Sequence, residues 1–267
     1  MRRAAGFTLI ELVMVIVLLS IVSLISVRFV SLSMEGAIDT ANRQRLGMAA
    51  GVVSEQLSRE LRSALTNSIR VSGDQRCIEF IPVLTGSRYI DIPFKNPEPS
   101  FDAVAAGSGQ DATGRVAVYP YAGDPYDPGS PGVVTEGITT LPDSGGEQSI
   151  AFGSGPHQFE EASPTRRFFI VGEPVAFRQE DGSRFLYRYS GYGFQSSVCD
   201  SLPGTFSATG ATREVVAAPL MPNSLSFDFV PPTLQRNGVA TFKFDLQSTD
   251  SDERIGVSQE VQVRNVP

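Results

Sequence analysis

The 267-residue sequence predicts an α+β fold, in which one long N-terminal helix is followed by an antiparallel β-sheet domain. Three observations lead to this fold class. An apolar run lies near the N-terminus, apolar residues spaced three or four apart follow it, and after about residue 69 the pattern changes to short apolar runs between turn residues. Such a helix is expected to cover one face of the sheet.

The apolar run is long enough to cross a bilayer as one helix. Between Phe7 and Ile25 there is no glycine or proline, and about 20 apolar residues span the hydrocarbon core. Its polar residues are Thr8, Glu11, Ser20 and Ser23. We therefore assign residues 7–28 to a transmembrane helix.

Glu11 places a carboxylate inside this helix. A charge near the bilayer centre costs roughly 2.5–3.5 kcal/mol even on mild insertion scales. A residue close to the cytoplasmic edge can instead extend its charge to water. Position alone therefore leaves both a functional and an incidental role open for Glu11.

The residues around Glu11 favour a functional role for this carboxylate over an incidental one. A short basic leader ending at Gly6, followed by Phe7 and by Glu11 at these spacings before an apolar helix, resembles the class III signal of prepilins. The resemblance implies a leader peptide of residues 1–6, cleavage between Gly6 and Phe7, and N-methylation of Phe7 by a prepilin peptidase/methyltransferase. It also implies a type IV pilin or a type II secretion pseudopilin, with other such subunits as partners.

This resemblance gives Glu11 an assembly role. In a filament of staggered parallel helices, its carboxylate would approach the new Phe7 amine of a neighbouring subunit. Breaking a buried ion pair typically costs about 3–5 kcal/mol, so the pair can select one stagger.

The basic leader also predicts the orientation of the chain. Arg2 and Arg3 precede the helix, which favours a cytoplasmic N-terminus. The expected location is therefore the inner membrane, crossed once, with the head domain in the periplasm or carried into an extracellular pilus.

Residues 29–70 are predicted to continue the helix as an amphipathic segment. The apolar stripe consists of Leu46, Ala50, Val53, Leu57, Leu61 and Leu65. Gly36 is the expected place for a bend. No proline occurs between Phe7 and Ile81, although many pilins have a helix-kinking proline in the outer part of this region.

Residues 71–267 are predicted to form a β-rich head domain. Cys77–Val83 is the first expected strand, ended by a turn and paired as a hairpin with Arg88–Ile92. Residues 95–165 are rich in Gly, Pro, Ser and Ala, so we expect a loop-rich insertion with a few short strands, within 132–141 and 149–152.

The last hundred residues show the clearest strands. Pro174–Arg178 and Arg184–Tyr189 flank an Asp-Gly turn, which predicts a hairpin. Apolar and polar residues alternate in Leu225–Phe229 and again in Thr241–Leu246, after the expected Asn237-Gly238 turn, which predicts two further strands. The final strand places Ile255, Val257, Val261 and Val263 on one face.

Four stretches resemble the MshO-type minor pilins of mannose-sensitive haemagglutinin (MSHA) pili: Arg59–Leu65, Arg70–Gly73 before Cys77–Val83, Leu186–Gly193 and Val261–Pro267. The resemblance implies a structural minor pilin that takes part in pilus assembly, priming or adhesion. The nearest alternative is a minor pseudopilin of type II secretion. A candidate from another class is a membrane-anchored periplasmic binding protein or hydrolase.

Cys77 and Cys199 are the only cysteines. In an oxidising periplasm they are expected to form a disulfide, with two separate thiols as the alternative. Such a closed loop of over a hundred residues would stabilise the head by about 4–5 kcal/mol.

The composition argues against several other functions. The net charge of −7 and the absence of a Lys/Arg run disfavour a nucleic-acid surface. His157, the only histidine, lies in a Gly/Pro loop and is expected to be solvated, so we predict neither a catalytic group nor a cofactor. The acidic clusters around Asp124 and around Asp250–Glu253 do not match a calcium-binding loop, so we predict solvated turn acids and no metal.

Overall fold

The computed structural model describes residues 8–105, 107, 110–143, 145–197, 199, 202, 211–233, 236–249 and 252–264. A single long helix, α1 (Leu9–Arg62), precedes three antiparallel sheets, so the α+β class is confirmed. The strands are β1 (Arg70–Val71), β2 (Cys77–Phe80), β3 (Val83–Asp91), β4 (Ser100–Val104), β5 (Ala112–Ala117), β6 (Thr139–Leu141), β7 (Glu147–Ala151), β8 (Arg167–Val171), β9 (Val175–Gln179), β10 (Leu186–Ser190), β11 (Thr212–Ala217), β12 (Ser226–Val230), β13 (Gly238–Gln247) and β14 (Arg254–Val263).

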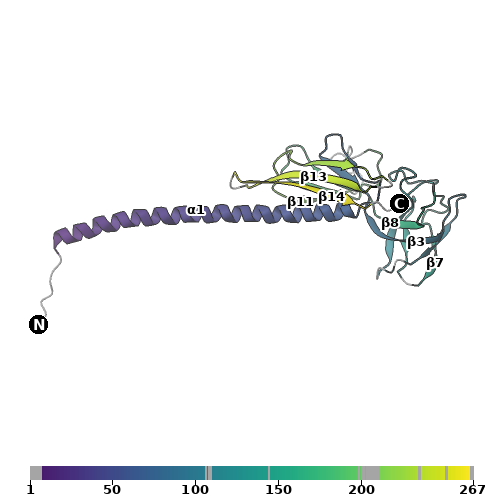
Figure 1. Cartoon of the computed structure of the whole chain (residues 1–267), viewed down its shortest axis with the longest axis horizontal. Helices are drawn as coiled ribbons and strands as arrows, with labels where there is room; N and C mark the ends of the chain where they lie inside the picture. The colour runs from purple at the N-terminus through teal and green to yellow at the C-terminus, as the bar shows by residue number, and fades with distance from the viewer. Residues whose placement is uncertain are drawn as a thin grey trace.

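Helix α1 is continuous over 54 residues, and Gly36 does not interrupt it. Figure 1 shows the helix extending far beyond the head at its N-terminal side, with β13 and β14 lying along its C-terminal part. The helix ends at Arg62, short of the predicted residue 70. The backbone turns away after Arg62, because the N–H of Leu65 donates to the carbonyl of Ile81 at 2.7 Å instead of to a helical carbonyl.

The proximal module consists of the C-terminal part of α1, the five-stranded sheet β1-β2-β9-β10-β11 and the three-stranded sheet β12-β13-β14. Its core combines the helix stripe with the inner faces of both sheets. Leu57 and Leu61 of α1 are fully buried among these strands, as are Phe80 and Phe242. The predicted stripe is therefore confirmed as the buried face of the helix from Leu46 to Leu61, whereas its last member, Leu65, is buried but lies beyond the end of α1.

The distal module is the six-stranded sheet β6-β5-β8-β3-β4-β7, which lies beyond the end of α1 (Figure 1). It has its own core, built around Phe101, Phe159, Phe168 and Ile170. The region predicted as a loop-rich insertion supplies four of its strands, β4 to β7. The prediction underestimated this order because the strands have only three to six residues and contain small residues such as Gly114.

Gly114 is required at the end of the antiparallel pairing between β5 and β8. A Cβ atom at this position would lie 2.4 Å from the carbonyl oxygen of Val171. Only glycine allows the two strands to approach so closely.

The predicted hairpin between Cys77–Val83 and Arg88–Ile92 is wrong. Strands β2 and β3 belong to different sheets, and the chain passes from the proximal to the distal module between them. Pro82 separates the two strands and has no N–H to continue a ladder. The adjoining Val83 N–H donates to the carbonyl of Ser63 at 2.8 Å, so this crossing point pairs with the end of the helix.

The predicted hairpin between Pro174–Arg178 and Arg184–Tyr189 is confirmed, and the later predicted strands are present. Strands β9 and β10 pair antiparallel around Gly182, which adopts a φ of 68°. Strands β12 and β13 also pair, and β14 completes their sheet. Val261 and Val263 of β14 are buried in the proximal core, with Ile255 and Val257 packed against it.

Candidate functional site

The N-terminal part of α1 forms the most extensive apolar surface of the described chain. Every residue from Leu9 to Ala41 is exposed, which corresponds to roughly 50 Å of helix at about 1.5 Å per residue. The helix is long and apolar enough to cross a membrane, and none of its most apolar window is buried. A surface of this size needs lipid or other helices to cover it.

Some hydroxyl groups along this segment donate to the helix backbone. The hydroxyl of Ser20 donates to the carbonyl of Ile16 at 2.7 Å, and that of Ser33 donates to Phe29 at 2.8 Å. Such bonds lower the cost of placing hydroxyls in an apolar environment. A carboxylate cannot be satisfied in this way, because it only accepts hydrogen bonds.

Glu11 lies in the first turn of α1 and is exposed. An acidic side chain there interacts favourably with the positive end of the helix dipole. Within the described residues, no ion pair involves Glu11. Gly6 and Phe7, the predicted cleavage and methylation positions, lie outside the described residues.

Polar contacts add to the apolar packing that holds the head on the helix. Arg188 Nε of β10 donates to Glu60 Oε2 at 3.1 Å, and Arg43 pairs with Glu253 near the β13–β14 turn. These two contacts lie at opposite ends of the buried stripe of α1. They therefore help to fix the direction in which the exposed part of the helix leaves the head.

A buried polar cluster stabilises the region where the two modules meet. Glu79 is only 1% exposed and accepts from Arg70 Nε at 2.8 Å and from the hydroxyl of Tyr192 at 2.8 Å. The Arg70 guanidinium lies 3.5 Å from the ring centre of Tyr126, whose hydroxyl donates to the carbonyl of Ser68. Tyr126 comes from the β5–β6 connection, so the cluster joins this segment to the proximal sheet.

Burial decides the protonation behaviour of this cluster. Desolvation raises the pKa of Glu79, and hydrogen bonds and charge from Arg70 oppose that rise. Desolvation, together with the nearby Glu79, also raises the pKa of Tyr192 and of Tyr126. Both tyrosines therefore remain neutral hydrogen-bond donors.

Cys77 and Cys199 are joined in a disulfide, with their Cα atoms 6.4 Å apart. The bond attaches the β10–β11 connection to β2, and Arg178 Nη1 donates to the carbonyl of Cys199 at 3.1 Å. Both cysteines are buried. The disulfide thus reinforces the segment that also carries Tyr192.

His157 is buried, at 2% exposure, and the prediction of a solvated histidine is wrong. Its ring packs against Phe152 and Phe159, with centroid distances of 5.5 and 4.3 Å. Burial lowers its pKa to about 4. The Gly/Pro content of the surrounding segment gave no indication of this aromatic cluster.

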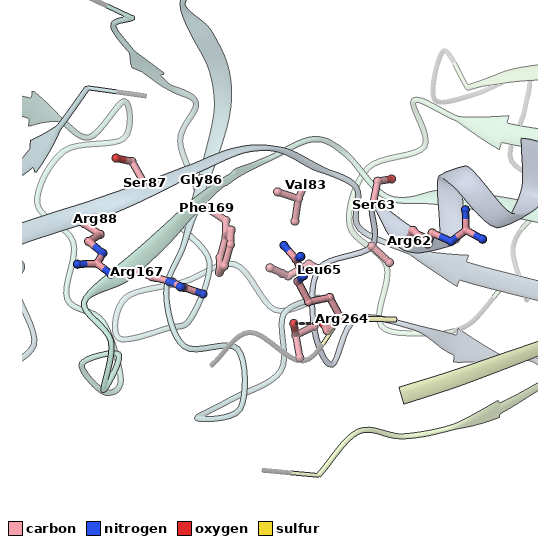
Figure 2. A pocket seen from close by; sticks show the side chains of 12 residues that line it. Arg62, Ser63, Leu65, Val83, Gly86, Ser87, Arg88, Arg167, Phe169 and Arg264 are labelled. Carbon is pink, nitrogen blue, oxygen red and sulfur yellow. Dashed lines mark hydrogen bonds between the residues drawn. The ribbon is translucent and has the colours of Figure 1, made fainter. Parts of the chain in front are cut away.

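A pocket of about 490 Å³ opens between the end of α1, the distal module and the end of β14. We call it the arginine pocket, because Arg62, Arg88, Arg167 and Arg264 line it. Figure 2 shows Arg88 and Arg167 together on one side, with Phe169, Val83 and Leu65 between them and Arg62. Sequence reasoning missed this pocket because its arginines come from four distant positions.

The described acids of the two acidic clusters make contacts within the protein. In the described part of the chain, no group of three or more His, Cys, Asp or Glu residues could hold a metal ion. Asp124 accepts from the Tyr126 N–H at 2.9 Å, as in a local turn. Glu253 pairs with Arg43, and Asp250 lies outside the described residues.

The comparisons with known proteins concern the N-terminal segment. A family model described as "Prokaryotic N-terminal methylation motif" matches residues 1–27. The chain carries a prepilin-type methylation motif. Together with the exposed apolar helix, this motif supports a membrane-anchored type IV pilin-like protein or pseudopilin, which is a structural subunit processed by a prepilin peptidase. No curated protein and no solved structure matches the chain.

Proposed function

We propose that the chain is a minor pilin of an MSHA-type pilus, cleaved between Gly6 and Phe7, N-methylated on Phe7 and assembled through α1. The single observation that carries this proposal is the methylation motif at the start of an exposed apolar helix. The MSHA type is supported by the resemblance of the four sequence stretches named above. In this arrangement the head faces the periplasm before assembly.

Glu11 is the assembly residue in this proposal. Its carboxylate lies in the first turn of α1, where a Phe7 amine from an adjacent subunit would form an ion pair with it. The head is far along the chain from this position and makes no ion pair with Glu11 among the described residues. Loss of the carboxylate should therefore affect assembly and leave the head folded.

The test compares Glu11→Ala with Glu35→Ala, which removes the same charge from another exposed position of α1. Both variants should be processed and membrane-embedded. We expect Glu11→Ala to reduce recovery of partner pilins in a pull-down and its own amount in sheared filaments, and Glu35→Ala to match the parent. Equal recovery from both variants would exclude Glu11 as the docking charge.

A second variant tests the processing step. Gly6→Leu places a bulky side chain at the cleavage junction, and we expect full-length chain in the membrane and none in filaments. Normal processing of this variant would remove the pilin assignment. Recovery of the processed parent with secretion components and never with sheared pili would favour the pseudopilin alternative.

A further inference from the structure

The arginine pocket concentrates positive charge in an acidic protein. The whole chain has 22 basic and 29 acidic residues. Arg62, Arg88, Arg167 and Arg264 form no ion pair with any described residue, as is also true of several other arginines, and these four are distinguished by lining one pocket together. The described residues that line the pocket include no Asp or Glu. The pocket is therefore electrostatically suited to an anionic group from outside the chain.

Arg88 and Arg167 make the strongest case for such a ligand. They are direct partners in the antiparallel register of β3 and β8, so their side chains share one face of the sheet. Like charges directly opposite each other destabilise a strand pair. Arg62, in contrast, lies in the last turn of α1, where a cation is favourable without any ligand. Among the described residues, the fold provides no similar stabilising interaction for Arg88 and Arg167, which lie opposite each other.

The remaining lining narrows the chemistry of the ligand. Val83 and Phe169, which are half-buried, give the pocket apolar surface beside the arginines (Figure 2). Gly86 lies opposite Phe169, and a Cβ atom there would be 2.9 Å from Cδ1 of the ring. The glycine thus allows the Phe169 ring to lie across β3 and to line the pocket.

We propose that the arginine pocket binds an acidic peptide segment of another subunit. Its carboxylates would accept hydrogen bonds from Arg88 and Arg167, which suit the planar two-oxygen geometry of a carboxylate. An apolar side chain of the same segment would cover Phe169 and Val83. An acidic glycan would match the charge and leave this apolar surface unused, so the peptide fits the lining better.

The test measures binding to the full-length chain in detergent by fluorescence anisotropy. The probe is a labelled peptide in which glutamates alternate with leucine and phenylalanine, and the control probe has glutamine in place of glutamate. Arg88→Gln/Arg167→Gln is compared with Arg45→Gln/Lys243→Gln, which removes the same charge at exposed positions that line no part of the pocket. We expect the pocket variant to bind the acidic probe at least about tenfold more weakly, and the control variant to match the parent.

Two further measurements complete the test. Because the opposed arginines repel each other, Arg88→Gln/Arg167→Gln should unfold at the same or a higher urea concentration than the parent, so its loss of binding will not reflect loss of folding. Equal binding by both double variants, or equal binding of the glutamine probe, would overturn the proposal. Tighter binding of heparin than of the peptide would assign the pocket to anionic glycans instead.

That the acidic peptide comes from another subunit rests on the proposed function, whereas the binding of an acidic peptide to the pocket does not. Probe binding is measured on unassembled protein, so a negative result leaves the cleavage at Gly6 and the role of Glu11 untouched. Conversely, failure of Gly6 processing would leave probe binding unchanged.

Discussion

Replacing Arg70 by methionine should strongly destabilise the head. The substitution removes the hydrogen bond from Arg70 Nε to Glu79 Oε2, the donation from Nη1 to the carbonyl of Ser196 at 3.1 Å, and the contact with the Tyr126 ring. Glu79 would remain almost completely buried, with the Tyr192 hydroxyl as its remaining side-chain donor among the contacts described. An uncompensated buried charge of this kind typically costs about 3–5 kcal/mol.

This magnitude is large compared with the total stability of a domain, which is commonly about 5–15 kcal/mol. The second variant, Arg70→Met/Glu79→Gln, removes the stranded charge as well. We expect it to recover at least about 2 kcal/mol relative to Arg70→Met, because most of the loss comes from the unpaired carboxylate.

Urea unfolding of the full-length chain in detergent measures both effects. The protein has seven tyrosines and no tryptophan, so near-UV circular dichroism of the tyrosines reports on the head. Far-UV signal from the detergent-embedded helix does not enter this readout. The Arg70→Met/Glu79→Gln variant serves as the matched control for loss of the Arg70 side chain.

The pH dependence of this destabilisation separates an unpaired charge from a simple loss of packing, because packing loss would not vary with pH. Burial already raises the pKa of Glu79 in the folded state, and removing Arg70 should raise it further. A folded-state pKa above the unfolded value means that stability is highest below the unfolded pKa, about 4.3, and falls as pH rises. The deficit of Arg70→Met should therefore be largest near pH 7 and shrink toward pH 5. A deficit independent of pH and equal in the double variant would refute this reasoning.

Three other perturbations test separate parts of the head. Cys77→Ser/Cys199→Ser removes the disulfide, which joins residues 122 positions apart. It should reduce the unfolding free energy by about 5 kcal/mol relative to the parent under non-reducing conditions. An unchanged urea midpoint would contradict this expectation. His157 is neutral in the fold, with its pKa lowered to about 4; because the unfolded value is about 6.5, up to about 3 kcal/mol should be lost as pH falls from 6.5 to 4, and His157→Gln should flatten that slope. Leu57→Ala should cost about 2–5 kcal/mol, whereas Val52→Ala, on the exposed face of α1, should cost under about 0.5 kcal/mol; similar costs would contradict the assignment of the buried helix face.

The features that sequence reasoning predicted well depend on local patterns. The stripe from Leu46 to Leu61 repeats with the period of an α-helix, so its buried face follows directly from spacing. Strands β12 and β13 follow from the alternation of apolar and polar residues within each, whereas Asn237-Gly238 is not their turn, since Gly238 already belongs to β13. The methylation motif is also local, because its residues lie at set spacings before one apolar helix.

The features that sequence reasoning missed depend on partners far apart in the chain. Strand β3 pairs with β8 across about eighty residues, and nothing in Val83–Asp91 indicates that partner. The expected strand Cys77–Val83 contains Pro82, whose missing N–H instead marks the crossing between the two modules. His157 is buried because Phe152 and Phe159 pack around it in three dimensions. The arginine pocket likewise arises only when four separate elements meet.

The N-terminal mass of the chain recovered from sheared filaments tests the central claim most directly. Peptide mass spectrometry should find a first residue of Phe7 that carries one added methyl group, and no peptide that includes residues 1–6. A chain that retains Met1, or one cut beyond the apolar run, would contradict the assignment of this protein as a processed pilin.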